Sequence, residues 1–179
     1  VMKFGGTSVA DLDCIKNAAS KVSQEVNNGF DVIVIVSAMS GETNRLVSLV
    51  NGVSKMHDAR EYDAIVSSGE NVTAGLMAVT LQEMGVLARS WQGWQVPLIT
   101  NSSHSSARII KIPTDILEEK FSKGMRVAVI AGFQGISEEG RLSTVGRGGS
   151  DTTAVAFASA CEAERCCIYT DGDGIYTID

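Results

Sequence analysis

Residues 32–36 read Val-Ile-Val-Ile-Val, an uninterrupted β-branched run without a polar position. A strand buried on one face alternates apolar and polar residues, so a continuous run predicts a strand covered on both faces. Residues 127–131 (VAVIA) repeat this pattern, and residues 166–170 (CCIYT) are predicted to form a third such strand. The chain is therefore expected to contain a sheet that is packed between other elements.

Helical patterns separate the apolar runs. We expect helices over about residues 11–27, 43–53, 71–84, 113–123 and 150–163. Strands that alternate with helices favour an α/β fold with a mainly parallel sheet and helices on both faces. The pair Glu139-Gly140, between two short extended stretches, predicts a β-hairpin within residues 134–145. At 179 residues, of which 44% are apolar, the chain fits one domain, residues 1–179.

Composition restricts the partners. The formal net charge is −6, and Lys and Arg are scattered singly rather than gathered in the basic stripe of a nucleic-acid binder. No apolar stretch reaches the ~18 residues that a membrane span needs. Residues 1–6 lack the apolar segment of a signal peptide and resemble a strand entered part-way. We therefore expect no nucleic-acid or membrane partner.

Four cysteines raise the question of disulfides or zinc. Adjacent residues of a strand point to opposite faces, which separates Cys166 from Cys167. The two histidines have no cysteine pair at zinc-ligand spacing. We expect free, mostly buried thiols and a cytoplasmic location, where thiols stay reduced.

Ligands of parallel α/β folds bind where loops leave the carboxyl ends of strands. Residues 3–8 (KFGGTS) follow the first strand. Their glycine pair allows close backbone approach to a phosphate, the following helix start adds a favourable dipole, and Lys3 supplies a positive charge. Because Gly-Gly turns also occur as purely structural features, this loop alone leaves both interpretations open.

Two later loops have similar chemistry. Residues 146–151 (GRGGSD) open a helix, where Ser150 or Asp151 could act as N-cap. A cap does not require Gly-Arg-Gly-Gly ahead of it, so an anion cradle is favoured. Residues 170–176 (TDGDGIY) have two carboxylates, but their glycines do not match a calcium-binding EF-hand loop. A loop that closes over a nucleotide, with Tyr176 as a flat apolar surface, fits better.

Two further segments carry polar groups at helix starts. Residues 37–44 (SAMSGETN) follow the second strand, and residues 67–70 (SSGE) place Glu70 at a helix entry. Glu70 is either a partner of the helix dipole or the acceptor of a substrate ammonium group. The P-loop, protein-kinase and nucleophile-elbow motifs are absent. A Rossmann dehydrogenase remains a weaker alternative, because residues 146–151 lack the full glycine fingerprint.

These five segments, KFGGTS, SAMSGETN, SSGE, GRGGSD and YTDGDGIY, resemble in order the signature loops of aspartate kinases, within the amino acid kinase family. The similarity covers the whole chain. Other members, such as N-acetylglutamate kinase, glutamate 5-kinase and uridylate kinase, share the fold and the glycine loops but generally lack SAMSGETN and SSGE.

The resemblance implies a three-layer α/β/α sandwich around a mainly parallel sheet. It implies transfer of the γ-phosphoryl group of ATP, with Mg²⁺, to the β-carboxylate of L-aspartate. The product, 4-phospho-L-aspartate, leads toward lysine, threonine and methionine. A homodimer is usual for the family. Another amino acid kinase, or a nucleotide-binding module without turnover, are the alternatives.

The resemblance also implies roles for individual residues. The catalytic residues would be Lys3, Arg147 and Asp151. Aspartate would be bound by Ser37, Thr43, Glu70, Arg147 and Ser150. ATP would be bound by Lys3, Gly5, Gly6, Ser8, Thr170, Asp171 and Tyr176. The attacking carboxylate needs no base, so Asp151 would organise Lys3 or the metal shell, and no residue is assigned as a dedicated metal ligand.

Two features depart from the family pattern. Gly172 stands where aspartate kinases more often carry an apolar residue such as valine. The family pattern also continues past the point where this sequence stops, with a later nucleotide-binding lysine and paired regulatory domains of the ACT type. We therefore expect residues 1–179 to be a catalytic domain truncated at its C-terminal end, without those regulatory domains.

Overall fold

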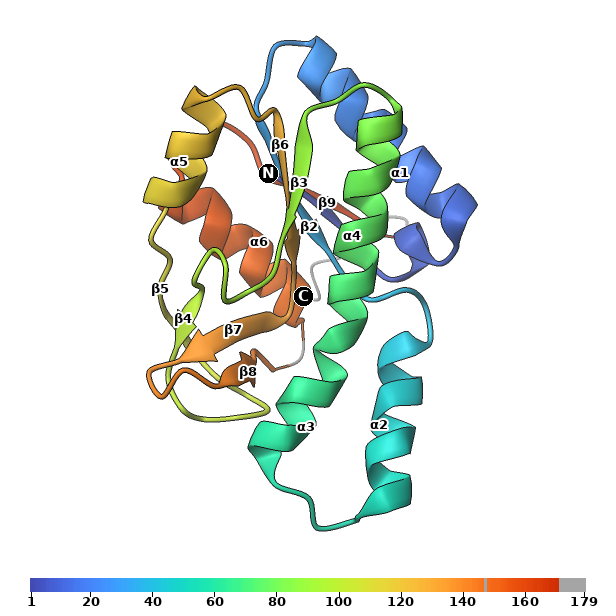
Figure 1. Ribbon diagram of the computed structural model, residues 1–179, viewed down its shortest axis with the longest axis vertical. Coiled ribbons are helices and arrows are strands. Elements are labelled where there is room, and N and C mark those ends of the chain that lie inside the picture. Colours follow the sequence, from blue (N-terminus) through green and yellow to red (C-terminus); the bar gives the residue numbers. More distant parts are fainter. Residues whose placement is uncertain (147, 171–179) are drawn as a thin grey trace, which may run out of the picture.

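A five-stranded sheet forms the centre of the molecule, in the order β3-β6-β2-β1-β9 (Figure 1). The computed structural model describes residues 1–146 and 148–170. The strands are β1 (Met2–Phe4), β2 (Val32–Val36), β3 (Ala88–Trp91), β6 (Val127–Ala131) and β9 (Cys167–Tyr169). Within the described residues all pairings of this sheet are parallel, which confirms the predicted α/β class.

Helices cover both faces of the sheet, and the side chains of β2 contribute to the core on each face. Val32, Val34 and Val36 enter a core with α1 (Leu12–Asn27) and α4 (Ser68–Glu83). Ile33 and Ile35 enter a second core with α5 (Asp115–Ser122) and α6 (Gly149–Ala160). Successive side chains of a strand point to opposite faces, so an all-apolar run supplies both cores at once. The predicted three-layer α/β/α sandwich is confirmed.

The third apolar run differs from its prediction. β9 lies at the edge of the sheet beside β1, and its middle residue, Ile168, is 38% exposed. The expectation of a strand buried on both faces is therefore wrong for residues 166–170. All four cysteines are free, but none is fully buried and Cys166 is exposed, which corrects the expectation of mostly buried thiols. The edge position is the reason for the exposure of Cys166 and Cys167, because no further strand covers this side among the described residues.

A second, smaller sheet lies beside the first and was not predicted. Its strands β4 (Ile99–Thr100), β5 (Ile109–Lys111), β7 (Gln134–Ser137) and β8 (Leu142–Thr144) run in the order β5-β4-β7-β8. The predicted hairpin is confirmed, since β7 and β8 pair antiparallel and Gly140 turns between them with φ +75°. Only glycine adopts this left-handed backbone without strain.

Two helices project from the same end of the molecule as the small sheet (Figure 1). They are α2 (Glu42–Val53) and α3 (Ala59–Val66), and a single turn of 3-10 helix, η1 (Thr7–Val9), follows β1. α3 was not predicted, and α4 begins at Ser68, three residues before the predicted start. α2 and α3 together form a pair of helices that faces the small sheet.

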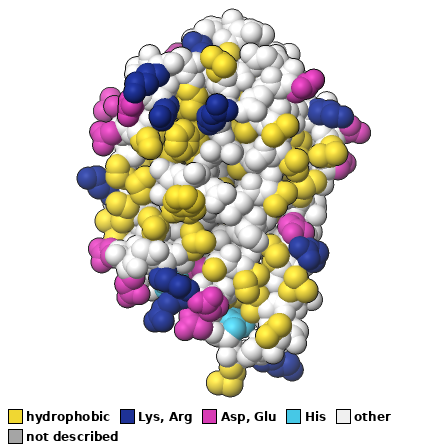
Figure 2. Space-filling view, in the orientation of Figure 1, with side chains coloured by type: hydrophobic (Ala, Val, Ile, Leu, Met, Phe, Trp, Pro, Cys, Tyr) yellow, Lys and Arg dark blue, Asp and Glu magenta, His cyan; other side chains and the backbone are white. Residues whose placement is uncertain are grey.

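The surface agrees with the composition. On the face drawn in Figure 2, Lys, Arg and acidic side chains lie in several separate groups, and the basic ones form no continuous stripe. Within residues 1–146 and 148–170, no helix has both the length and the apolar character to cross a membrane.

Candidate active site

The loops singled out in the sequence start at one edge of the large sheet. Phe4 pairs with Val36 and with Tyr169, so their strands end level with one another. The next residues extend this ladder: Ser37 N–H donates to the Phe4 carbonyl at 3.1 Å, and Gly5 N–H to the Tyr169 carbonyl at 3.3 Å. Parallel pairing thus gathers the loops after β1, β2 and β9, as the rule for α/β sheets requires.

Lys3 and Asp151 form an ion pair at this edge. The Lys3 Nζ lies 2.7 Å from Asp151 Oδ1, and the two side chains are 10% and 50% exposed. A Cβ on Gly5 would lie 3.4 Å from the same Nζ. The buried ammonium group is therefore beside the glycine loop, and α6 supplies the carboxylate that holds it.

The start of α6 contradicts the alternative that Ser150 or Asp151 is the N-cap of this helix. The N-cap is Gly148, in the left-handed conformation with φ +72°, and no side chain caps the helix. Ser150 and Asp151 instead lie in the first turn of α6. Among the described residues no side-chain cap occupies the first-turn N–H groups of α6, which favours an anion at this helix N-terminus.

Ser150 connects two of the predicted loops. Its Oγ lies within hydrogen-bond distance, 3.0 Å, of the Ser37 Oγ. Ser37 follows β2 and Ser150 opens α6, so this contact ties a strand end to the helix that carries Asp151. The structure thus brings together four of the predicted residues: Lys3, Ser37, Ser150 and Asp151.

A cavity of about 370 Å³, here called the glycine-loop cavity, opens between the loops after β1 and β2. Its lining residues are Gly5, Gly6, Thr7, Ala38, Met39, Ser40, Gly41, Thr43, Asn44 and Thr170. A Cβ on Gly6 would lie 3.1 Å from the Ala38 carbonyl oxygen, so glycine permits the close approach of the two loops. Of the residues predicted for the site, Gly5, Gly6, Thr43 and Thr170 line this cavity, whereas Ser8 lies in η1 and is not among the lining residues.

A second cavity of about 460 Å³, here called the aromatic cavity, continues along α2. Its lining residues are Val47, Asn51, His57, Tyr62, Ser105, Phe133, Thr144 and Gly146. Thr43, Val47 and Asn51 are spaced by four residues and share one face of α2, so the two cavities lie along the same helix. The rings of His57 and Tyr62 stack with centroids 4.9 Å apart.

Phe133 is the most informative residue that the sequence reasoning missed. It has a left-handed backbone, with φ +68°, two residues after the carboxyl end of β6. Its N–H donates to Thr153 Oγ1 at 3.2 Å, and a Cβ on Gly149 would lie 2.6 Å from its ring. Strained non-glycine residues cluster at functional sites. The rule that directed attention to the other strand ends would have found Phe133 too.

Glu70 is buried behind the loop that follows β2. Its side chain comes from the first turn of α4, is 3% exposed, and accepts a hydrogen bond from Ala38 N–H at 3.2 Å. Its other oxygen, Oε2, is buried and has no hydrogen-bond partner within the described residues. Burial raises the pKa of Glu70 to about 7, against the smaller opposing effect of backbone N–H groups. A positively charged donor would satisfy this oxygen.

The raised pKa of Glu70 makes stability depend on pH. Between its unfolded pKa of 4.5 and its folded pKa of about 7, the native state binds more protons than the unfolded state. The stabilising effect of the protonated form is complete below pH 4.5 and is lost as pH rises through 7. We expect the free energy of unfolding to fall by about 1 kcal/mol between pH 6 and 8 on this account. Urea unfolding of the parent and of Glu70→Gln at both pH values measures this change in the free energy of unfolding. An equal pH dependence of the two proteins would contradict the role of Glu70.

Three predicted site residues lie outside the described residues: Arg147, Asp171 and Tyr176. Mg²⁺ takes oxygen ligands, commonly one or two carboxylates together with substrate phosphates. Among the residues that the structure describes, no group of three or more His, Cys, Asp and Glu side chains could hold a metal ion. The half-exposed carboxylate of Asp151 fits an ion that arrives with the phosphates of a nucleotide.

The chain belongs to the amino acid kinase family, whose model matches residues 1–179. It is 50% identical over its whole length to the aspartate kinase of Stutzerimonas stutzeri, of which it covers 43%. The crystal structure of aspartate kinase from Synechocystis matches 96% of the chain, with 40% identity and a TM-score of 0.79, and the chain covers 28% of it. Aspartokinase III of E. coli in complex with aspartate and ADP matches 98% of the chain, with 27% identity and a TM-score of 0.85, and half of that protein is covered. The chain thus spans less than half the length of the curated relative.

Proposed function

We propose that this chain is the catalytic part of an aspartate kinase, which transfers the γ-phosphoryl group of ATP to the β-carboxylate of L-aspartate. The observation that carries the proposal is the Lys3–Asp151 ion pair beside the glycine loop, at the edge where Glu70 offers a buried, unpartnered oxygen. The Lys3–Asp151 ion pair suits a phosphoryl group in transfer. The Glu70 oxygen suits the ammonium group of an amino acid. The relatives named aspartate kinase, matched over the full length of the chain, support the same substrate.

The chemistry needs positioning and charge neutralisation more than acid–base catalysis. The attacking oxygen belongs to a carboxylate, so no proton has to be removed. Lys3 neutralises charge on the transferred phosphoryl group, and Asp151 holds the Lys3 ammonium in place at 2.7 Å. The N–H groups at the start of α6 and of Gly6 add donors for the same oxygens. Bound Mg²⁺ would supply further charge neutralisation on the ATP phosphates.

We place the phosphates on the Gly5-Gly6 side of the glycine-loop cavity. We place the amino acid where that cavity meets the aromatic cavity along α2, with Thr43 beside it and Glu70 behind the loop after β2. The first cavity has backbone N–H groups and hydroxyls on its walls. The second is larger and has both apolar and hydroxyl residues on its walls, and it ends at Gly146, next to Arg147. Arg147 would pair with a substrate carboxylate, and Asp171 and Tyr176 would contact the nucleotide. The product, an acyl phosphate, would serve amino-acid biosynthesis.

Aspartate-dependent ADP release by the complete gene product, with trapping of the acyl phosphate by hydroxylamine, tests the function. We expect both signals with L-aspartate and ATP–Mg²⁺, and neither with glutamate or N-acetylglutamate in its place. Thermal shift by ATP but not by NAD would separate a kinase from a dehydrogenase. ATP binding without any aspartate-dependent product would contradict the proposal and leave a nucleotide-binding module.

A further inference from the structure

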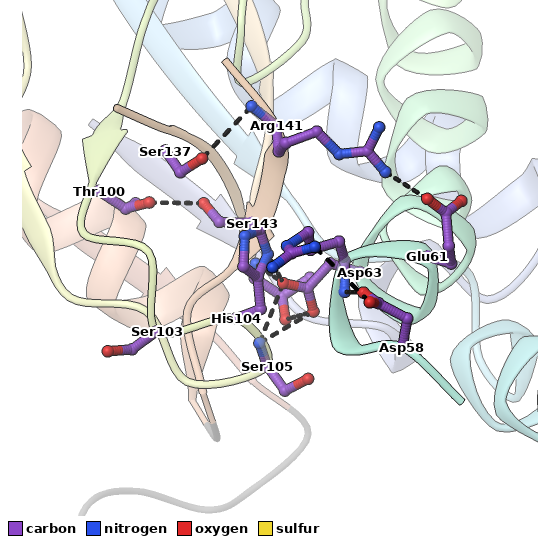
Figure 3. Close-up of polar contacts among 12 residues, drawn as sticks. Asp58, Glu61, Asp63, Thr100, Ser103, His104, Ser105, Ser137, Arg141 and Ser143 are labelled. Atoms are coloured by element: carbon purple, nitrogen blue, oxygen red, sulfur yellow. Dashed lines mark hydrogen bonds and ion pairs between the residues drawn. The ribbon is translucent and has the colours of Figure 1, made fainter. Parts of the chain in front are cut away.

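The most heavily hydrogen-bonded buried side chain in the described part of the chain, Asp63 of α3, has no role in the chemistry above (Figure 3). It is fully buried. Its Oδ1 accepts a hydrogen bond from Thr144 Oγ1 at 2.7 Å, and its Oδ2 accepts from Thr144 N–H at 3.1 Å. Ser105 N–H lies 3.0 Å from both oxygens, and His104 Nδ1 lies 2.9 Å from Oδ2. One carboxylate thus joins α3, β8 and the loop between β4 and β5.

Two of the three residues that contact the Asp63 carboxylate line the aromatic cavity. Ser105 and Thr144 line it directly, and Tyr62 lines it from the position that precedes Asp63. Thr144 lies two residues before Gly146, where β8 leads into the glycine-rich loop. Asp63 itself does not line the cavity. Its carboxylate therefore fixes the relative positions of three walls without reaching the space between them.

Ser105 also needs an external constraint. Its backbone has φ +66°, in the left-handed region that a serine adopts only with strain. Both oxygens of Asp63 accept from its N–H and hold it in this conformation. A neutral amide at position 63 would turn a donor toward Ser105 N–H in either orientation, because both oxygens of Asp63 accept from that group. Two donors that face each other in a buried site destabilise it.

We propose that Asp63 is a positioning residue for the acceptor pocket, setting the distance between Tyr62, Ser105 and Thr144. The inference rests on the proposed function, because it makes the aromatic cavity part of the pocket for the phosphoryl acceptor. None of the residues that contact Asp63 lines the glycine-loop cavity, whose walls come from the loops after β1, β2 and β9. Its loss should therefore disturb acceptor binding and leave nucleotide binding intact.

Glu61 provides a matched control on the same helix. It pairs with Arg141, next to the β7–β8 hairpin, at the exposed surface, so it also connects α3 to the small sheet (Figure 3). Glu61→Gln removes a contact between the same two elements without touching the cavity. An exposed ion pair contributes little to stability. Comparing Asp63→Asn with Glu61→Gln therefore separates two effects. One is the loss of any contact between α3 and the small sheet, and the other is the loss of the hydrogen bonds of Asp63.

The experiment measures the KM for aspartate, the KM for ATP and kcat in the complete gene product. We expect Asp63→Asn to raise the KM for aspartate at least tenfold, with the KM for ATP within twofold of the parent, and Glu61→Gln to change neither. Hydrogen–deuterium exchange at the amides of Ser105 and Thr144 should become faster only in Asp63→Asn. This second measurement does not depend on turnover.

The outcomes separate the two proposals. A parent protein without aspartate-dependent ADP release contradicts the proposed function, whatever the exchange data give. An active parent in which Asp63→Asn changes both KM values equally, or behaves like Glu61→Gln, overturns the role of Asp63. If Asp63→Asn does not fold, His104→Phe takes its place, because it keeps the ring and removes one hydrogen bond. His104→Phe should raise the KM for aspartate several-fold and leave the KM for ATP unchanged. Any other pattern of change in the two KM values overturns the inference.

Discussion

Replacing Lys3 by alanine is expected to lower kcat by roughly 10²-fold or more, the magnitude usual for a preorganised group that stabilises charge in the transition state. The ammonium group is buried, is held at 2.7 Å by Asp151 and lies beside Gly5. Its interaction with the phosphoryl oxygens should strengthen as the bond to the leaving group breaks. The two KM values should therefore change much less than kcat.

Two variants make the test of Lys3 specific. Lys3→Met keeps the aliphatic stem within β1 and removes only the charge, so it should fold and lose the same activity. Lys16→Ala, at an exposed position of α1, removes the same charge far from the site and should leave kcat unchanged. A kcat within threefold of the parent for both Lys3 variants would contradict the assignment.

The second large effect is expected from Glu70→Gln, on the KM for aspartate. A charge-assisted hydrogen bond to the substrate ammonium contributes about 1.5–3 kcal/mol, which corresponds to a roughly ten- to hundredfold rise in KM. The KM for ATP should change far less. The Ala38 N–H can still donate to the amide oxygen of glutamine, so the loop after β2 keeps its support.

Steady-state kinetics against both substrates measures this difference. Glu83→Gln, at the exposed end of the same helix, is the control and should change neither KM. Equal increases in the two KM values for Glu70→Gln would indicate that Glu70 only supports the start of α4 and the adjoining loop.

The sequence predicted the part of the fold that follows from strong periodicity. The runs at residues 32–36 and 127–131 match β2 and β6 to the residue, because two opposite cores leave no position for a polar side chain. The run at 166–170 has similar composition but lies at an edge. Composition describes what a strand tolerates, whereas its place in the sheet depends on which strands pair with it.

The sequence predicted the part of the site at the ends of the strands of the large sheet. It did not predict the part formed by α3 and the small sheet. Lys3, Ser37, Ser150 and Asp151 belong to glycine-containing segments that the sequence singled out, and the structure brings them together. Asp63 gave no signal, because a single carboxylate in a short helix normally indicates a solvent-exposed face. Its burial depends on donors from residues 104, 105 and 144, which are far away in sequence. Strands of two to four residues, such as β4 and β8, are likewise too short for periodicity to detect.

The position of β1 has a consequence for how the protein folds. β1 is an inner strand, between β2 and β9, although it comes first along the chain. Its second partner and the carboxylate that holds Lys3 come from the last helix and strand of the described chain. Contacts between such distant segments require closure of a long loop, which slows folding. The Lys3–Asp151 pair should therefore form late, and partly folded chains should lack a working site even when the α1–α4 core has already packed.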